Sequence, residues 1–106
     1  MSTFQSLGLS PNILKAIEAE GYKTPTPIQE QAIPPLLDGR DVLAVAQTGT
    51  GKTAAFSLPV LEIMNNRTDS NKSIKALILS PTRELAAQID QRFAAYSKHM
   101  AISHMV

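Results

Sequence analysis

The sequence has no cysteine among its 106 residues and only two histidines. Without cysteine there is no disulfide framework, no thiolate nucleophile and no cysteine-based zinc site, and a reducing intracellular compartment is permitted. His99 and His104 are too few for a metal site built from histidine. Ten basic residues against nine acidic ones give a net charge of +1, so no broad basic surface points to nucleic acid or an anionic membrane. Any anion site must therefore be local.

Long apolar runs are also absent. No segment approaches the roughly 18 apolar residues that a spanning helix needs, and the N-terminus lacks the basic start of a secretion signal. We therefore expect a soluble, cytoplasmic protein with no membrane contact. Apolar residues make up 43% of the chain, enough for a core, but 106 residues amount to one small or incomplete domain at most.

Start and stop signals predict four helices. Ser-Pro before residue 12 and a glycine at 21 predict a helix over about 11–20, and Thr-Pro before residue 28 predicts a second one that reaches Gly39. Pro34 and Pro35 should kink or break that second helix. A largely buried helix is expected from Lys52, and apolar residues at intervals of four predict an amphipathic helix over about 83–97.

Short apolar runs at 42–46, 74–79 and 102–106 are typical of strands buried on both faces. Their alternation with helices predicts an α/β fold with a parallel sheet and right-handed crossovers. Ligands of such sheets bind at the carboxyl ends of the strands, where the loops at 46–53 and 80–83 should lie. The chain stops inside the third strand, so we expect an incomplete domain.

A phosphate-binding loop is indicated between the first strand and the following helix. The common pattern is Gly, four residues, then Gly-Lys-Ser/Thr, and here alanine takes the first position. The glycines let backbone N–H groups turn toward a phosphate, Lys52 can reach the β and γ phosphates, and Thr53 can hold Mg2+. Lys52 and Thr53 are the catalytic candidates. The residues predicted to bind the nucleotide here are Ala46, Gln47, Thr48, Gly49, Thr50, Gly51, Lys52 and Thr53.

Three blocks of sequence together resemble the DEAD-box ATP-dependent RNA helicases. Residues 21–29 (GYKTPTPIQ) are similar to that family's Q motif, 46–53 (AQTGTGKT) to its phosphate loop with alanine first, and 81–86 (PTRELA) to its motif Ia. The resemblance covers almost the whole chain, and its opening looks most like bacterial RhlE-type members. It implies the N-terminal part of a first RecA-like domain of the P-loop NTPase type. We divide the chain into a Q-motif helical region, 1–40, and an incomplete ATP-binding region, 41–106.

The resemblance also implies roles for the Q motif. The Gln29 amide would pair with adenine and select ATP over GTP, while Tyr22 would pack against the base. Thr24 belongs to the same block, and Phe4 is the isolated aromatic residue that accompanies it. Two alternatives stay open: Gln29 has the position of an ordinary capping box behind a threonine, and Phe4 can be a core aromatic that supports the motif.

Motif Ia implies contact with the RNA backbone through Pro81, Thr82 and Arg83. Arg83 falls in the first turn of a helix, where the dipole favours an anion and penalises a cation. A bound RNA phosphate would resolve that conflict. The alternatives are a salt bridge to Glu84 or a neighbour, and simple solvation.

The implied activity is RNA-duplex unwinding or remodelling of RNA–protein complexes, with ATP and Mg2+ as cofactors and little sequence specificity. The family's Asp-Glu-Ala-Asp box, its Ser-Ala-Thr motif and its second RecA-like domain are not among these residues, so we expect the 106 residues alone to be inactive. A binding module without hydrolysis and another kind of P-loop NTPase are the alternative functions. Oligomeric state and protein partners are not indicated.

Overall fold

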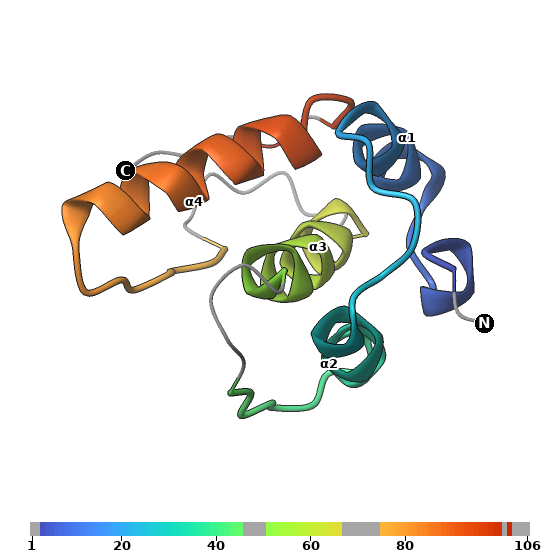
Figure 1. Ribbon diagram of the computed structural model, residues 1–106, viewed down its shortest axis with the longest axis horizontal. Coiled ribbons are helices and arrows are strands. Elements are labelled where there is room, and N and C mark those ends of the chain that lie inside the picture. The colour runs from blue at the N-terminus through green and yellow to red at the C-terminus, as the bar shows by residue number, and fades with distance from the viewer. Residues whose placement is uncertain (1–2, 46–50, 67–74, 101, 103–106) are drawn as a thin grey trace.

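The computed structural model describes residues 3–45, 51–66, 75–100 and 102. A short 3-10 helix, η1 (Gln5–Leu7), is followed by α1 (Pro11–Ala19), α2 (Pro27–Leu37), α3 (Lys52–Asn65) and α4 (Arg83–Tyr96). Helix α3 lies at the centre and packs against α2 on one side and α4 on the other (Figure 1). Helix α1 packs against α4, and η1 against α2. The four predicted helices are therefore confirmed.

Helix α2 begins where the sequence predicts, with Thr26 as N-cap and Pro27 in the first turn. It continues through Pro34 and Pro35 to Leu37, so of the predicted kink or break, the break is wrong. Each proline lacks the N–H that would bond the carbonyl four residues back, and the helix ends two residues after the second proline. Helix α3 likewise runs through its internal proline at 59.

The core lies among the four helices, and α3 contributes to it along most of its length. Two polar side chains of α3, Ser57 and Glu62, are buried with the apolar ones. Glu62 accepts a hydrogen bond from the backbone N–H of Ser10, which holds the start of α1 against α3. The largest buried apolar side chains are Ile13, Ile17, Ile33, Leu58, Leu61 and Tyr96.

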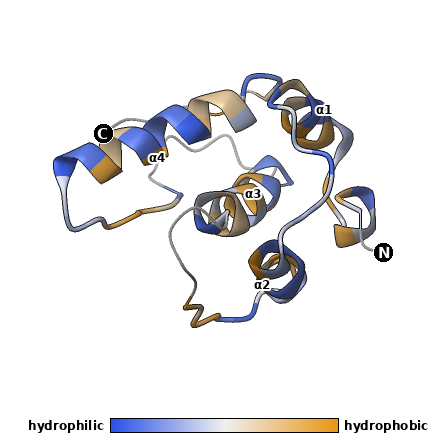
Figure 2. Ribbon diagram, viewed as in Figure 1, coloured by the Kyte–Doolittle hydropathy of each residue, from blue (hydrophilic) through white to orange (hydrophobic). Residues whose placement is uncertain are grey.

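The predicted strands are not seen in the part of the chain that the structure describes. Residues 42–45 and 75–79 belong to no helix or strand, and their side chains are not buried: Leu43 is 96% exposed and Leu79 85%. Apart from Ile102, the third predicted strand lies outside the described residues. Parallel strands are buried only when neighbouring strands and helices cover them, and no such cover lies over these two segments. Figure 2 shows the apolar residues of 42–45 at the periphery of the molecule.

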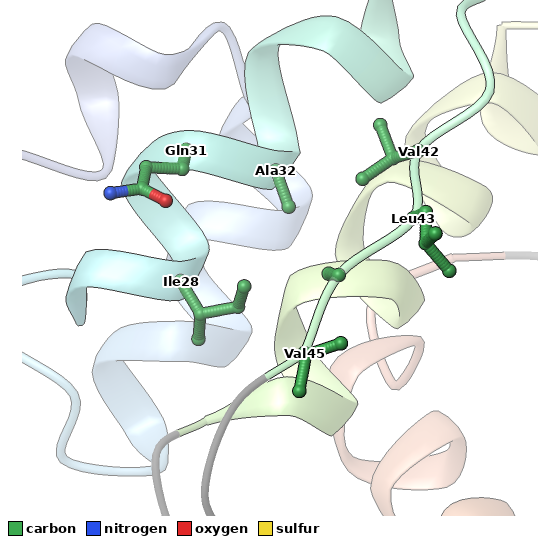
Figure 3. A pocket seen from close by; sticks show the side chains of 7 residues that line it. Ile28, Gln31, Ala32, Val42, Leu43 and Val45 are labelled. Atoms are coloured by element: carbon green, nitrogen blue, oxygen red, sulfur yellow. The ribbon is translucent and has the colours of Figure 1, made fainter.

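A pocket of about 250 Å³ separates α2 from the first of these segments. Figure 3 shows Ile28 and Ala32 of α2 opposite Val42 and Val45, whereas Gln31 points away from the extended segment. None of the predicted site residues lines this pocket. Among the helices in the described ranges, none has the length and apolar character to cross a membrane.

Candidate functional site

The amide of Gln29 connects two helix N-termini. Its Oε1 accepts a hydrogen bond from the backbone N–H of Thr26 at 2.9 Å, and its own backbone N–H donates to the Thr26 hydroxyl at 3.5 Å, so the predicted capping box is present. In addition, Gln29 Nε2 donates to the carbonyl of Gly51, directly before α3, at 3.3 Å. Gln29 is only 4% exposed. The structure thus brings the Q-motif block and the end of the phosphate-loop block into direct contact.

Gly51 is at a position that other residues do not fit. Its φ of +87° lies in the left-handed region, where a Cβ is strained. A Cβ at Gly51 would also collide with Gln29 Nε2 and would lie 3.0 Å from Thr26 Oγ1. The glycine therefore permits both the turn into α3 and the close approach of Gln29.

The N-terminus of α3 has no side-chain cap among the described residues, because its N-cap is a glycine. The first intrahelical hydrogen bond runs from Ala55 N–H to the Gly51 carbonyl at 3.0 Å, which leaves the N–H groups of Lys52, Thr53 and Ala54 without an intrahelical acceptor. The Lys52 side chain is exposed and that of Thr53 half-buried. The other five predicted loop residues, 46–50, lie outside the described residues.

This N-terminus fits an anion coordinated to a metal ion. Free N–H donors at the positive end of a 14-residue helix favour negative charge, and Lys52 adds a formal positive charge. Thr53 offers one hydroxyl, the ligand by which phosphate loops commonly hold Mg2+. The described residues hold no cluster of three His, Asp or Glu side chains suited to a metal ion. The residues are thus suited to a metal ion carried by a bound phosphate.

Phe4 and Tyr22 line a second pocket, of about 410 Å³, between η1, α1 and the connector that follows α1. Phe4 is buried and belongs to the core cluster, which favours the supporting role for its ring. Tyr22 is partly buried, and Thr24, two residues on, is exposed. The exposure of these three residues therefore increases from Phe4 to Tyr22 to Thr24.

Tyr22 also takes part in a cluster that joins the connector to α4. Its hydroxyl lies 3.0 Å from the hydroxyl of Tyr96, and the two ring centroids are 6.1 Å apart. Arg92 Nη1 donates to Tyr22 Oη at 3.4 Å and to Glu20 Oε1 at 3.1 Å. Burial and the bond with Tyr22 raise the pKa of the Tyr96 phenol well above its usual range, so the phenol is neutral at physiological pH. We call Glu20, Tyr22, Arg92 and Tyr96 the tyrosine cluster.

The predicted RNA-contacting residues lie at the N-terminus of α4. The Thr82 hydroxyl accepts from Leu85 N–H at 3.1 Å and so caps the helix. Its own O–H remains available to donate. Arg83 is exposed in the first turn and forms no ion pair with any described residue, so the alternative of a salt bridge to Glu84 is not found. Pro81 is exposed beside them.

Sequence reasoning missed two features of this region. Arg92 and Glu20 were not singled out, and their partners lie 70 or more residues away along the chain, so no local motif signals them. Glu62 also has no role of its own in the sequence analysis, although its side chain is buried. A charged residue within an otherwise apolar helix face is the one sequence signal that points to such a role.

Comparison with protein families gives one family model, described as "DEAD/DEAH box helicase", which matches residues 26–106. The ATP-dependent RNA helicase DeaD of Buchnera aphidicola subsp. Acyrthosiphon pisum is 50% identical over 105 residues, which are 99% of this chain and 17% of that protein. The DeaD protein of Klebsiella pneumoniae is 54% identical over 99 residues, 93% of this chain and 15% of that protein. The chain thus spans about a sixth of the length of these relatives. The RhlE-type assignment stays a prediction.

Solved structures show the same similarity. The RNA helicase Prp28 from Chaetomium thermophilum, bound to ADP, superposes with a TM-score of 0.88 at 41% identity, over 97% of this chain and 26% of that one. Dbp5 of S. cerevisiae, bound to RNA and ADP BeF3, superposes with a TM-score of 0.87 at 40% identity and the same coverage. The contact between the Q-motif block and the phosphate-loop block therefore occurs in a chain that belongs to the DEAD/DEAH box helicase family.

Proposed function

We propose that this chain is the ATP-binding part of an ATP-dependent RNA helicase, which unwinds short RNA duplexes or remodels RNA–protein complexes by ATP hydrolysis. The observation that carries the proposal is the hydrogen bond from Gln29 Nε2 to the Gly51 carbonyl, at 3.3 Å. It places a side chain able to read a base beside the start of a helix able to hold phosphates. One nucleotide can occupy both positions because the two motifs are in contact.

At the phosphate end, the free N–H groups at the start of α3 and the Lys52 ammonium would bind the β and γ phosphates. Thr53 would place its hydroxyl on Mg2+, which neutralises the charge that develops during phosphoryl transfer. Residues 46–50 would contribute further backbone donors, as in the sequence prediction. Lys52 and Thr53 are thus the two catalytic residues that we assign to this chain.

At the base end, Gln29 still has hydrogen-bonding capacity. An amide offers two N–H donors and two acceptor lone pairs, and the capping box and Gly51 use one of each. One donor and one acceptor remain, which is the pair that adenine needs along its amino edge. Gln29 can therefore keep its structural role and select ATP. Tyr22 would pack on the base, Thr24 would lie beside it, and Phe4 would support the motif from the core.

At the RNA end, Thr82 and Arg83 stand exposed at the N-terminus of α4, with Pro81 beside them. A cation in the first turn is unfavourable unless an anion lies close by. An RNA phosphate supplies that anion, and binding through the backbone explains why little sequence specificity is expected. The ADP-bound Prp28 and the RNA-bound Dbp5 support both ligands as candidates for this chain.

The sheet and the division of the chain are part of the same proposal. We propose that 42–46, 74–79 and 102–106 pair as parallel strands of a RecA-like domain, after a Q-motif helical region at 1–40. The exposed apolar side chains of the first two segments support this, because a paired sheet would cover them. We place the helicase in the cytoplasm. The 106 residues alone should not hydrolyse ATP, since the groups that orient the attacking water are not among them.

The test uses the complete helicase. RNA-stimulated ATP hydrolysis and unwinding of a short RNA duplex are measured for the unchanged protein and for Lys52→Ala. We expect Lys52→Ala to lose hydrolysis by at least about a hundredfold, because the phosphate charge is then uncompensated. Lys15→Ala removes an exposed lysine of α1 and is the matched control. Near-normal turnover in Lys52→Ala, or the absence of any RNA-stimulated hydrolysis in the unchanged protein, would overturn the proposal.

A further inference from the structure

The tyrosine cluster ties a connector to a helix that is remote in sequence. Tyr22 lies between α1 and α2, whereas Arg92 and Tyr96 lie in the second half of α4. The Tyr22 hydroxyl meets the Tyr96 hydroxyl at 3.0 Å and the Arg92 guanidinium at 3.4 Å. The same guanidinium nitrogen is held by Glu20 at 3.1 Å. The far end of the Tyr22 side chain therefore has two partners, and both belong to α4.

The backbone around Tyr22 fixes the near end of the same side chain. Tyr22 N–H donates to the Ile17 carbonyl at 3.2 Å, which ends α1 directly before the connector. The hydroxyl of a tyrosine lies on the long axis of its ring, so a fixed backbone and a fixed hydroxyl together determine χ1 and the position of that axis. The Tyr96 ring lies beside it, with the two centroids 6.1 Å apart. Loss of the hydroxyl contacts leaves the backbone unchanged and frees only the ring.

The α4 side of the cluster is rigid. Tyr96 is 1% exposed and packs in the core, so its hydroxyl cannot move unless the core repacks. Arg92 is held at two points by Glu20 and Tyr22. A buried phenol and a guanidinium with two hydrogen-bond partners are both suited to hold the Tyr22 hydroxyl in one geometry.

We propose that Arg92 and Tyr96 are positioning residues for nucleotide binding: acting through the Tyr22 hydroxyl, they hold the Tyr22 ring in the position that packs against the base. This inference rests on the proposed function, because it needs a nucleotide base at Tyr22. It adds two residues of α4 that make no contact with the nucleotide themselves. Their effect should appear in nucleotide affinity and not in the chemical step, because Lys52 and Thr53 lie elsewhere.

The primary experiment compares Tyr22→Phe and Tyr96→Phe in the complete helicase, with saturating RNA. Each variant removes one hydroxyl and keeps the ring. We expect the KM for ATP to rise about fivefold in Tyr96→Phe, the effect of one hydrogen bond, and at least as much in Tyr22→Phe, which also loses the bond from Arg92. In each variant kcat should stay within about twofold. The KM for GTP should rise by the same factor, because packing on a ring does not depend on the identity of the base. A purely structural role would instead lower the active fraction, and so kcat, without changing KM.

A double-variant test asks whether the two hydroxyls act through each other. The variant with both Tyr22→Phe and Tyr96→Phe should show the KM of Tyr22→Phe alone, because that substitution already removes the hydrogen bond that Tyr96→Phe loses. Two independent effects would multiply instead, and that outcome would overturn the inference. If Tyr96→Phe does not fold, the KM of Tyr22→Phe alone tests the inference. Tyr22 is less buried than Tyr96, so its substitution should disturb the core less.

Arginine variants supply a matched control. Arg92→Met should raise the KM for ATP about as much as Tyr22→Phe, and Arg92→Lys should recover part of the loss. Arg40→Met breaks the ion pair with Asp38, whose side chains are 73% and 74% exposed, and should leave KM unchanged. An unchanged KM in Arg92→Met and both tyrosine variants would overturn the inference. Loss of activity in Lys52→Ala, measured in the same series, would still support the proposed function when the inference about Arg92 and Tyr96 fails.

Discussion

Three helix N-termini in this chain follow two opposite designs. At α2, Thr26 and Gln29 satisfy each other's free backbone groups, and at α4 the Thr82 hydroxyl accepts from Leu85 N–H. At α3 the N-cap is Gly51, and no described side chain caps the helix. An unpaired N–H group at a helix start costs stability unless water or a ligand accepts it. The difference separates ends that maintain the fold from the end best suited to bind an anion.

The capped end at α2 is nevertheless coupled to the uncapped end at α3. Gln29 completes the cap of α2 with Oε1 and holds the Gly51 carbonyl with Nε2. A change at either end should therefore be felt at the other. Two substitutions test this coupling and a third tests the separate cap of α4, in decreasing order of expected effect.

The largest effect is expected from Gly51→Ala. An alanine at a φ of +87° is strained, and its Cβ would collide with Gln29 Nε2, so we expect a loss of about 2–5 kcal/mol in the free energy of unfolding and a sharp rise in the KM for ATP. Gly39→Ala is the matched control, because Gly39 has a φ of +82° with nothing within 4 Å of the added carbon. For both variants, denaturant unfolding measures the stability and ATPase kinetics measure the KM for ATP. Equal effects from the two substitutions would show that the contact with Gln29 is unimportant.

Gln29→Ala should have an intermediate effect on stability. It removes one half of the capping box and one of the two hydrogen bonds to the Gly51 carbonyl, which keeps the bond from Ala55 N–H, at a cost of about 1–2 kcal/mol. It should also reduce the preference for ATP over GTP about tenfold or more. Thr26→Ala weakens the same cap without touching the amide, so its selectivity should be normal. The measurement is the ratio of kcat/KM for ATP to kcat/KM for GTP in both variants. Normal selectivity in Gln29→Ala would leave Gln29 with its capping role alone.

The smallest effect is expected at α4. Thr82→Ala should lower the free energy of unfolding by about 1 kcal/mol through loss of the cap, and Thr82→Ser should restore it. Ser10→Ala is the control, because the Ser10 hydroxyl caps nothing and has no hydrogen-bond partner in the described structure. RNA affinity should fall in Thr82→Ala if the hydroxyl also donates to a phosphate. A stability loss with unchanged RNA affinity would restrict Thr82 to the cap.

Local signals in the sequence were enough to predict the helices and the capping box. Thr26 with Gln29 three residues later determines a helix start from chemistry that lies within one turn, and the structure shows both of its hydrogen bonds. The start of α4 was predicted from apolar periodicity instead, and the capping role of Thr82 was not predicted. Prolines were the exception: Pro34 and Pro35 predict a kink or a break, whereas α2 continues through both of them.

Contacts between distant residues could not be predicted. Nothing in the sequence near Tyr22 indicates that its hydroxyl meets Tyr96, since that pairing depends on how α1 packs against α4. The contact of Gln29 with Gly51 is similar, because it needs α2 and α3 to lie side by side. The apolar runs near 43 and 77 predict buried strands, but burial depends on neighbours, and in the described structure these runs remain uncovered.

Those uncovered runs also determine how the 106 residues behave in a test tube. Leu43 and Val45 follow Arg40 and Asp41, and the second run contains Lys75 near its start, so the charges nearest to each run lie toward its N-terminal end. Charges at such positions slow edge-to-edge association, but a charge on one side leaves the other side open. Concentrated solutions of this piece should therefore self-associate through extended segments, and short acidic or lysine-rich extensions after each run should keep it monomeric.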